Sequence, residues 1–220
     1  MLVKDILSNN LPLLHSSDTV FQALQMMNEN MVSHLPLVEH DEFMGMVSSE
    51  MLIDAEEEES QLNQLELVFP LYSVKAEDHI LKALQLASLH SLSSIAVLNE
   101  NNEWVGALSY AELNKQVANF LGLQELGGLI VLEKESNQFS LSEITKLVET
   151  NDAQVTQLNT FTNLQTGLTQ ITIRISKPEI SDIVATFQRY DYLVLFYSGE
   201  ELYANELKSN YDNLMHYLKI

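Results

Sequence analysis

Two segments of the chain carry the same pattern of hydrophobic and polar positions, displaced by 60 residues. Each begins with apolar residues three and four positions apart, a spacing typical of a helix that buries one face. The pattern predicts two equivalent helices, with Ser17 or Asp18 as the cap of the first and Asp78 as the cap of the second. The apolar stripes consist of Val20, Ala23, Leu24 and Met27, and of Ile80, Ala83, Leu84 and Ala87.

A short apolar run follows each helix and predicts a strand, a polar turn and a second strand. Each second strand ends at a serine, Ser48 in the first segment and Ser109 in the second, where another helix is predicted to begin. The second turn is one residue longer, which changes the displacement from 60 to 61 residues. The predicted strands are 35–38, 43–47, 95–98 and 104–108.

The repeated unit resembles the CBS domain, whose copies occur in pairs as a Bateman module. The resemblance rests on the Ala-Leu helix, the strand after it, and an ending of glycine, two hydrophobic residues and serine at 45–52 and 106–113. It covers about residues 1–121, with one repeat at about 1–60 and another at about 61–121. Two copies in register make the resemblance more specific than one copy would. It implies a tandem CBS pair that dimerises into a disc.

The remainder of the chain is predicted to have the order β-α-β-β-α-β. Glycines mark a linker at 122–128, and a domain is predicted at 129–199. The order is that of the ferredoxin-like split βαβ, so the chain falls in the α+β class. A CBS pair followed by this unit resembles the CBS–ACT proteins of the acetoin-utilisation type, which implies an ACT-like domain. The predicted strands are 129–132, 155–161, 171–175 and 193–197, and the helices lie around 141–148 and 180–187.

A last helix is predicted at 200–220. Leu207, Tyr211, Leu214 and Leu218 form an apolar stripe along it. Such a stripe requires a partner, which is either the same domain or another subunit.

The composition narrows the functional classes. The chain has 220 residues, no cysteine and a formal net charge of -20. A chain of this length can bury a core without disulfides or metals, and an acidic surface repels nucleic acid and anionic membranes. No signal peptide and no apolar run of membrane-spanning length are found, so a cytoplasmic location is expected. No Lys or Arg occurs between Lys4 and Lys75, a stretch that is either a solvated acidic face or a patch that attracts cations.

The resemblance implies two adenosine-binding clefts, in which the serine of each ending lies near phosphate and a following Asp grips the ribose hydroxyls. In the second repeat these positions are Ser109 and Glu112. A carboxylate can accept two hydroxyl donors, and the start of a helix has free backbone N–H groups. Ser73, Ser94 and Ile95 would line the same cleft. The alternative is that Ser109 and Glu112 only cap the helix that follows.

The first repeat is a weaker candidate. Met51 stands at the position of the carboxylate, beside Ser48, and a thioether is a weak hydrogen-bond acceptor. Leu13, His34 and Leu35 would line this first cleft. Lys75, Lys82 and Lys115 are predicted to supply positive charge to the second repeat.

The sequence gives little indication of catalysis, metal binding or amino-acid binding. No pair of histidines at metal-binding spacing, no glycine-rich phosphate loop and no Ser–His–Asp order is present, so we predict no enzymatic activity, metal site or cofactor. His40, beside Asp41, and the run 56–59 could bind a divalent cation loosely, although a solvated turn and an acidic loop explain them more simply. ACT domains that bind amino acids place a glycine in the turn after the first strand, and the turn 133–137 has none.

The sequence therefore predicts a non-catalytic regulatory protein. Its CBS pair would bind an adenosine-containing ligand, either AMP, ADP, ATP or S-adenosylmethionine, and signal through the arrangement of a homodimer to a protein partner. The competing hypothesis is a ligand-independent scaffold for protein interactions with degenerate CBS pockets, which Met51 and the missing glycine favour.

Overall fold

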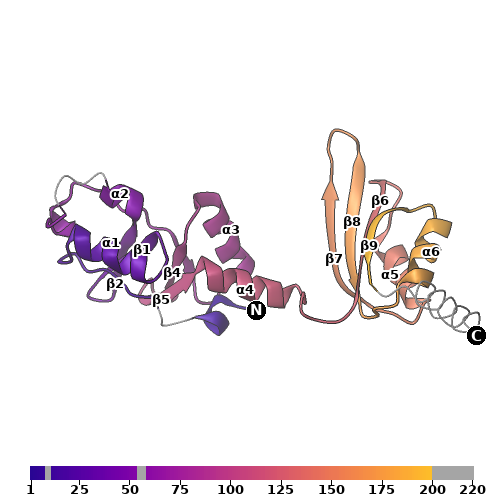
Figure 1. The fold of residues 1–220 in the computed structure, drawn as a ribbon, viewed down its shortest axis with the longest axis horizontal. Coiled ribbons are helices and arrows are strands. Elements are labelled where there is room, and N and C mark those ends of the chain that lie inside the picture. The colour runs from indigo at the N-terminus through magenta and orange to yellow at the C-terminus, as the bar shows by residue number, and fades with distance from the viewer. Residues whose placement is uncertain (8–10, 54–57, 200–220) are drawn as a thin grey trace, which may run out of the picture. The chain divides into compact units, whose positions relative to one another are not determined.

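The computed structural model describes residues 1–7, 11–53 and 58–199, and its contacts divide the chain into two compact units, Met1–Leu123 and Gln124–Ile220. Figure 1 shows the elements of each unit. The helix predicted at 200–220 lies outside the described residues. No helix in the described part of the chain is both long and apolar enough to cross a bilayer.

The first unit contains two copies of one arrangement, in which a helix is followed by an antiparallel strand pair and a second helix (Figure 1). In the second copy a short strand, β3 (Ser73–Lys75), runs parallel to the first strand of the pair, and Leu14 makes the matching bridge to Leu37 in the first copy. The first copy consists of α1 (Val20–Glu29), β1 (His34–Glu39), β2 (Glu42–Ser48) and α2 (Ser49–Ile53). The second consists of α3 (Ile80–His90), β4 (Ser94–Leu98), β5 (Trp104–Ser109) and α4 (Tyr110–Phe120).

The N-caps of α1 and α3 lie one residue after Asp18 and Asp78, the predicted cap residues. Thr19 and His79 are the N-cap residues, and their side chains accept hydrogen bonds from backbone N–H groups of the first turn. Asp18 and Asp78 each accept a hydrogen bond of 2.8 Å from the backbone N–H group three residues earlier. These carboxylates therefore close the turn that precedes the helix and do not cap the helix itself.

A local twofold axis relates the copies, because equivalent residues of the two copies contact each other. Glu42 forms an antiparallel bridge with Glu103, its equivalent in the repeat. The rings of Phe43 and Trp104, which are also equivalent, stack with their centroids 6.5 Å apart. Equivalent residues can touch only near the axis that exchanges them. The two repeats therefore form one pseudo-symmetric body.

The copies exchange their N-terminal segments. The 3-10 turn Val3–Ile6 packs in the core of the second copy, and the turn Leu62–Gln64 packs in the core of the first. An antiparallel bridge joins each segment to the N-cap of the long helix it covers. The boundary predicted near residue 60 thus separates the sequence repeats but not the packed halves.

Strand alternation gives each copy a core of its own and a second buried surface. One face of each strand pair packs on the helices, and the core residues of this face are Leu35, Leu37 and Val47, and Ile95, Val97 and Leu108. The opposite face is also buried and belongs to neither core. Because β1 and β2 both contact β4, this face lies where the copies meet. Its buried residues include Pro36, Met46, Ser94, Ala96 and Ala107.

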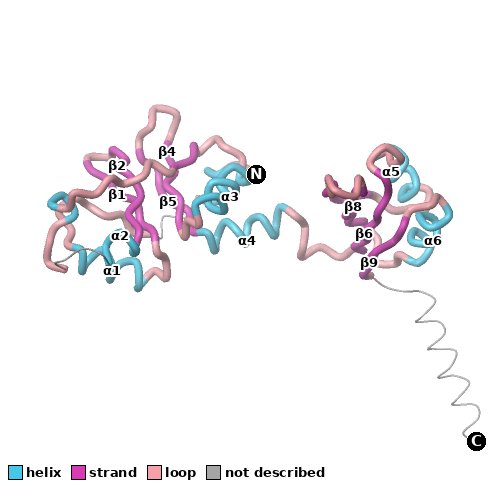
Figure 2. Tube along the Cα trace, turned by 90° about the horizontal axis from the view of Figure 1, so that it is seen from above, coloured by secondary structure: helices cyan, strands magenta, loops and turns pink. Residues whose placement is uncertain are grey.

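The second unit has the predicted ferredoxin-like topology, a four-stranded antiparallel sheet in the order β7-β8-β6-β9. Both helices cover one face of the sheet (Figure 2). Ile171, Ile173 and Ile175 alternate along β8 toward these helices and pack with Phe187 in a single core. The elements are β6 (Gly128–Glu135), α5 (Leu141–Glu149), β7 (Val155–Thr162), β8 (Leu168–Ile175), α6 (Ser181–Arg189) and β9 (Leu193–Ser198).

Candidate functional site

The polar candidate residues lie where the strands of the two copies begin and end. His34 opens β1 opposite Ser48 at the end of β2, and Ser94 opens β4 opposite Ser109 at the end of β5. Residues paired in this way lie on the same face of a strand pair. The ends meet across the local axis, because the hydroxyl of Ser94 donates a hydrogen bond of 2.6 Å to the carbonyl oxygen of His34. The structure thus brings four candidate residues to one polar junction.

Two serines that were not predicted as site residues hold this junction together. Ser33 and Ser93 directly precede β1 and β4. The hydroxyl oxygen of Ser93 accepts hydrogen bonds from the backbone N–H groups of Ser33 and His34, at 2.8 Å and 2.9 Å. The displacement of 60 residues between the two serines was a signal in the sequence that could have identified them.

The imidazole of His34 is a half-buried acceptor at the junction. Its Nδ1 atom accepts a hydrogen bond of 3.3 Å from the backbone N–H of Ser93 and lies 3.0 Å from the hydroxyl of Ser33. A backbone N–H can only donate, so Nδ1 carries no proton and the ring is neutral. Burial lowers the pKa of His34, and the negative charge of Glu50 opposes this shift only in part.

We expect the protein to lose stability in acid through His34. Because the folded-state pKa lies below the ordinary value of 6.5, the unfolded chain takes up a proton first as the pH falls. The contribution of His34 is therefore complete above pH 6.5 and is lost as the pH falls through its lowered pKa. Urea unfolding on both sides of this range measures the loss. His34→Asn, which keeps an acceptor for Ser93, should reduce it, and an unchanged pH dependence in this variant would contradict the assignment.

The helix starts at Ser48 and Ser109 have the same geometry in both copies. The hydroxyl of Ser109 accepts a hydrogen bond of 3.1 Å from the backbone N–H of Glu112, and the hydroxyl of Ser48 accepts one of 3.2 Å from that of Met51. Both serines therefore cap a helix, which is the structural role considered above for Ser109. The two copies differ at the third position after the serine, which is a thioether (Met51) in the first copy and a carboxylate (Glu112) in the second.

The carboxylate of Glu112 already has partners on its own helix. One of its oxygens accepts a hydrogen bond of 2.6 Å from the side-chain amide of Gln116, and the other lies 3.8 Å from the ammonium group of Lys115. A partly exposed ion pair of this kind contributes only about 0–1 kcal/mol. These contacts are weak enough for a ligand that supplies better donors to displace them.

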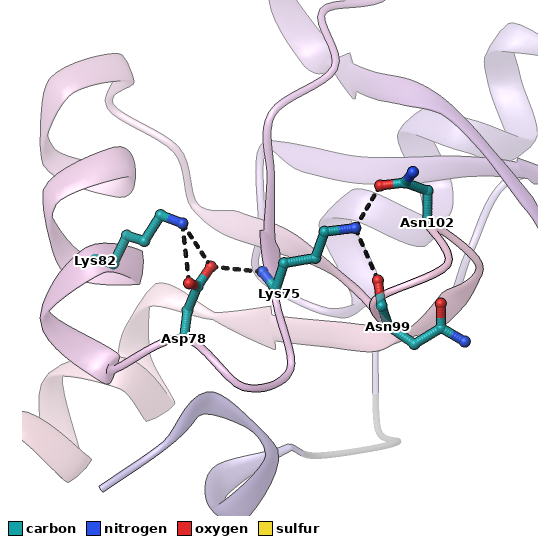
Figure 3. A network of polar contacts seen from close by, with 5 residues as sticks. All are labelled: Lys75, Asp78, Lys82, Asn99 and Asn102. Atoms are coloured by element: carbon teal, nitrogen blue, oxygen red, sulfur yellow. Dashed lines mark hydrogen bonds and ion pairs between the residues drawn. The ribbon is translucent and has the colours of Figure 1, made fainter.

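The lysines predicted to give the second copy its positive charge are also engaged (Figure 3). The ammonium group of Lys75 donates to the backbone carbonyl of Asn99 at 2.7 Å and to the side-chain oxygen of Asn102. The ammonium group of Lys82 contacts both carboxylate oxygens of Asp78 at 2.9 Å. Burial alone would raise the pKa of Asp78, but hydrogen bonds from Lys82 and from the backbone of Lys75 outweigh it and hold the pKa below its ordinary value. Both ammonium groups therefore stabilise the loops around β3, but only the charge of Lys82 is paired with a carboxylate.

The remaining predicted site residues are more dispersed. Ser73 pairs with Ala96 and lines a shallow pocket of about 170 Å³ together with Lys82. The side chains of Leu35 and Ile95 have no exposed surface and point into the two cores, away from the junction. Leu13 is half-buried just before the bridge residue Leu14.

Comparisons with known proteins agree with this architecture. The sequence model of the CBS domain matches residues 3–58. A CBS domain pair/ACT domain protein from Thermotoga maritima has a similar structure, with 25% identity and a TM-score of 0.50 over 55% of this chain and 99% of that one. A structure described as an acetoin utilization protein (AcuB) from Vibrio cholerae matches with 21% identity and a TM-score of 0.48, over 56% of this chain and 95% of that one. A search of curated proteins found no match.

Together with the twofold axis and the sheet order, these findings define the class of the protein. It is an α+β chain whose first unit resembles a tandem CBS pair and whose second unit has ferredoxin-like topology. It is similar to a CBS domain pair/ACT domain protein, as the two repeats followed by the β-α-β-β-α-β order implied.

Proposed function

We propose that this chain is a non-catalytic regulatory protein whose second CBS repeat binds an adenosine-containing ligand. The observation that carries the proposal is the difference between two otherwise matched sites. Ser48 and Ser109 cap their helices in the same way, but only the second copy has a carboxylate, Glu112, at the third position after its serine, where the first copy has Met51. The binding residues would be Ser109 and Glu112, with Ser94 and Ser73 on the same face of the sheet.

The chemistry of this site suits a ribose. The two hydroxyl groups of a ribose can both donate to one carboxylate, which accepts through two oxygens. Binding would replace the hydrogen bond from Gln116 to the charged carboxylate of Glu112, and hydrogen bonds to charged groups contribute about 1.5–3 kcal/mol. The start of α4 adds backbone N–H groups that favour a nearby phosphate.

Regulation would follow if the ligand binds one arrangement of the protein better than another. A ligand shifts an equilibrium only by its difference in affinity for the two states. We infer that the two states are arrangements of a homodimer formed through the CBS pair, which a protein partner in the cytoplasm would read. The ferredoxin-like unit would stabilise or transmit this arrangement.

A second candidate function is a scaffold that needs no ligand. It is favoured by the hydrogen bond that Ser94 donates to His34, and by the partners of Lys75 and Lys82, because these groups are already satisfied within the protein. Met51 in the first copy points in the same direction. In this case the pair would act through contacts with other proteins alone.

A thermal-shift experiment distinguishes the two functions. If the proposal is correct, at least one of AMP, ADP, ATP and S-adenosylmethionine should raise the melting temperature. A ligand at 100 times its dissociation constant adds about 2.7 kcal/mol of stability. Glu112→Ala should abolish this shift and Glu112→Asp should retain it, because the aspartate keeps the carboxylate.

Met51→Ala is the matched control, since it alters the equivalent position of the first copy and should leave the shift intact. A parent protein that responds to none of these compounds would overturn the sensor function and favour the scaffold. A shift that survives in Glu112→Ala would place the ligand elsewhere.

A further inference from the structure

The second unit has a cavity that the proposed function does not use. It lies between α5 and α6 and has a volume of about 690 Å³, which is within the range of roughly 300–1,000 Å³ typical of small-molecule sites. One face of α5, the turn after it and the last turn of α6 line the cavity. All of these residues belong to the ferredoxin-like unit, so the cavity is independent of the CBS pair.

Two cationic side chains, Lys146 and Arg189, line this cavity. Neither forms an ion pair with a described residue of the chain. The carboxylate of Glu143 also belongs to the lining, but it accepts a hydrogen bond of 2.5 Å from the hydroxyl of the buried residue Tyr192. With two cations and one carboxylate, the cavity lining carries a net charge of +1 on a chain whose net charge is -20. The ion pairs of the described residues are Lys4–Glu77, Lys82–Asp78 and Lys115–Glu112.

The guanidinium group of Arg189 is held in place by a buried hydroxyl. Thr186, only 5% exposed, accepts hydrogen bonds from Arg189 at 3.0 Å and from the side-chain amide of Asn151 at 3.3 Å. The same amide donates to the backbone carbonyl of Leu147 at 2.8 Å, which ties α5 to α6. A guanidinium has five N–H donors, so Arg189 keeps donors for a ligand after this contact.

The cavity also offers an apolar surface. Leu147 is buried and Tyr190 is 50% exposed, and both contribute to the lining. Lys134 donates a hydrogen bond of 2.9 Å to the backbone carbonyl of Tyr190, which fixes the end of α6. An aromatic ring at the edge of a polar pocket is a favourable surface for a planar or apolar group.

We propose that this cavity binds a small organic anion. A carboxylate or phosphate group of the ligand lies between Lys146 and Arg189, and a ring or apolar part of it rests on Leu147 and Tyr190. At about 0.1 M salt, charges more than about 10 Å away are largely screened, so the local cations outweigh the acidic remainder of the chain.

The test is a titration of the full chain followed by amide chemical shifts, with phenyl phosphate, benzoate and the neutral benzamide as probes. We expect saturable shifts confined to 142–151 and 186–190 with both anions and none with benzamide. Phenyl phosphate should bind more tightly, because it carries between one and two negative charges near neutral pH. Comparison of the affinities for phenyl phosphate and benzoate shows whether the cavity prefers a phosphate or a carboxylate group.

Lys146→Gln and Arg189→Gln should each weaken binding by about tenfold, equivalent to about 1.4 kcal/mol. Lys115→Gln, which removes a cation from the CBS pair, is the matched control and should leave the affinity unchanged. The amide spectra of the variants show directly that they remain folded. Shifts outside this cavity, binding of benzamide equal to that of benzoate, or affinities unchanged in both cavity variants would overturn the proposal.

Discussion

Replacing Gly45 with alanine is expected to lower the free energy of unfolding of the first unit by about 3 kcal/mol or more. Gly45 lies within β2 at a φ of +141°, and holding a residue with a Cβ in such a conformation costs roughly 1–3 kcal/mol. A Cβ here would also lie 2.5 Å from the Cβ and 2.7 Å from the carbonyl oxygen of Phe69. Overpacking of this kind costs roughly another 1–3 kcal/mol. The neighbouring backbone cannot move away cheaply, because the carbonyl of Pro70 accepts a hydrogen bond of 2.9 Å from Met46.

The chain contains a single tryptophan that reports this unfolding directly. Trp104 stacks on Phe43 in the first unit, so its fluorescence during urea unfolding follows the unit that contains Gly45. Gly167→Ala is the matched control, measured by circular dichroism. Gly167 has a φ of +70°, and a Cβ added to it would meet no atom within 4 Å, so we expect a cost of only about 1 kcal/mol. A Gly45→Ala variant no less stable than this control would contradict the close approach of Phe69.

The repeat could be predicted because short segments of the sequence are sufficient to identify it. Helical spacing around the Ala-Leu pairs, two short apolar runs and a closing serine define each copy without any long-range information. The same holds for the clean alternation of β8, which identified a strand of the ferredoxin-like sheet. A helix or strand of this kind can be predicted because one of its faces is apolar and the spacing of the apolar residues shows its type.

The exchange of segments between the copies was not predictable in the same way. Val3–Ile6 is a single 3-10 turn that packs on the helix beginning at Ile80. A turn of this length has too few residues to show a period, and nothing in its own sequence indicates which of two similar cores it enters. The prediction of Asp18 and Asp78 as N-caps was wrong for a related reason. Aspartate is a favourable N-cap residue, but here both side chains close the turn before the helix, and the residue after each of them is the N-cap.

The candidate site shows the same limit. The sequence could place Ser109 and Glu112 at the start of a helix, because a cap and its helix are neighbours. It could not show that the ammonium group of Lys75 donates hydrogen bonds to Asn99 and Asn102. These partners are 24 and 27 residues away in the sequence and come close to Lys75 only after β4 and β5 pair. The cavity between α5 and α6 likewise depends on side chains brought together by folding alone.

Truncating Ile95 to alanine is expected to cost about 2–5 kcal/mol, and truncating Leu35 the same. Both side chains have 0% exposure and pack in the core of their copy, so removing their methyl groups leaves cavities that the surrounding strands cannot fill. Urea unfolding followed by the fluorescence of Trp104 measures the loss. Leu89→Ala is the control, because Leu89 is 74% exposed and its truncation should change stability by no more than about 0.5 kcal/mol.

The same variants separate a core role from a ligand-binding role. Ile95 and Ser94 are adjacent in β4, but strand alternation sends Ser94 to the junction with His34 and Ile95 to the opposite face. At temperatures where Ile95→Ala remains folded, we therefore expect any adenosine compound that binds the parent to bind this variant with nearly the same affinity. A variant that instead kept its stability but lost the ligand would place Ile95 in the cleft. The face of β4 that packs on the helices would then have to be the binding face, whereas Ser94 and its partner Ser109 lie on the other face.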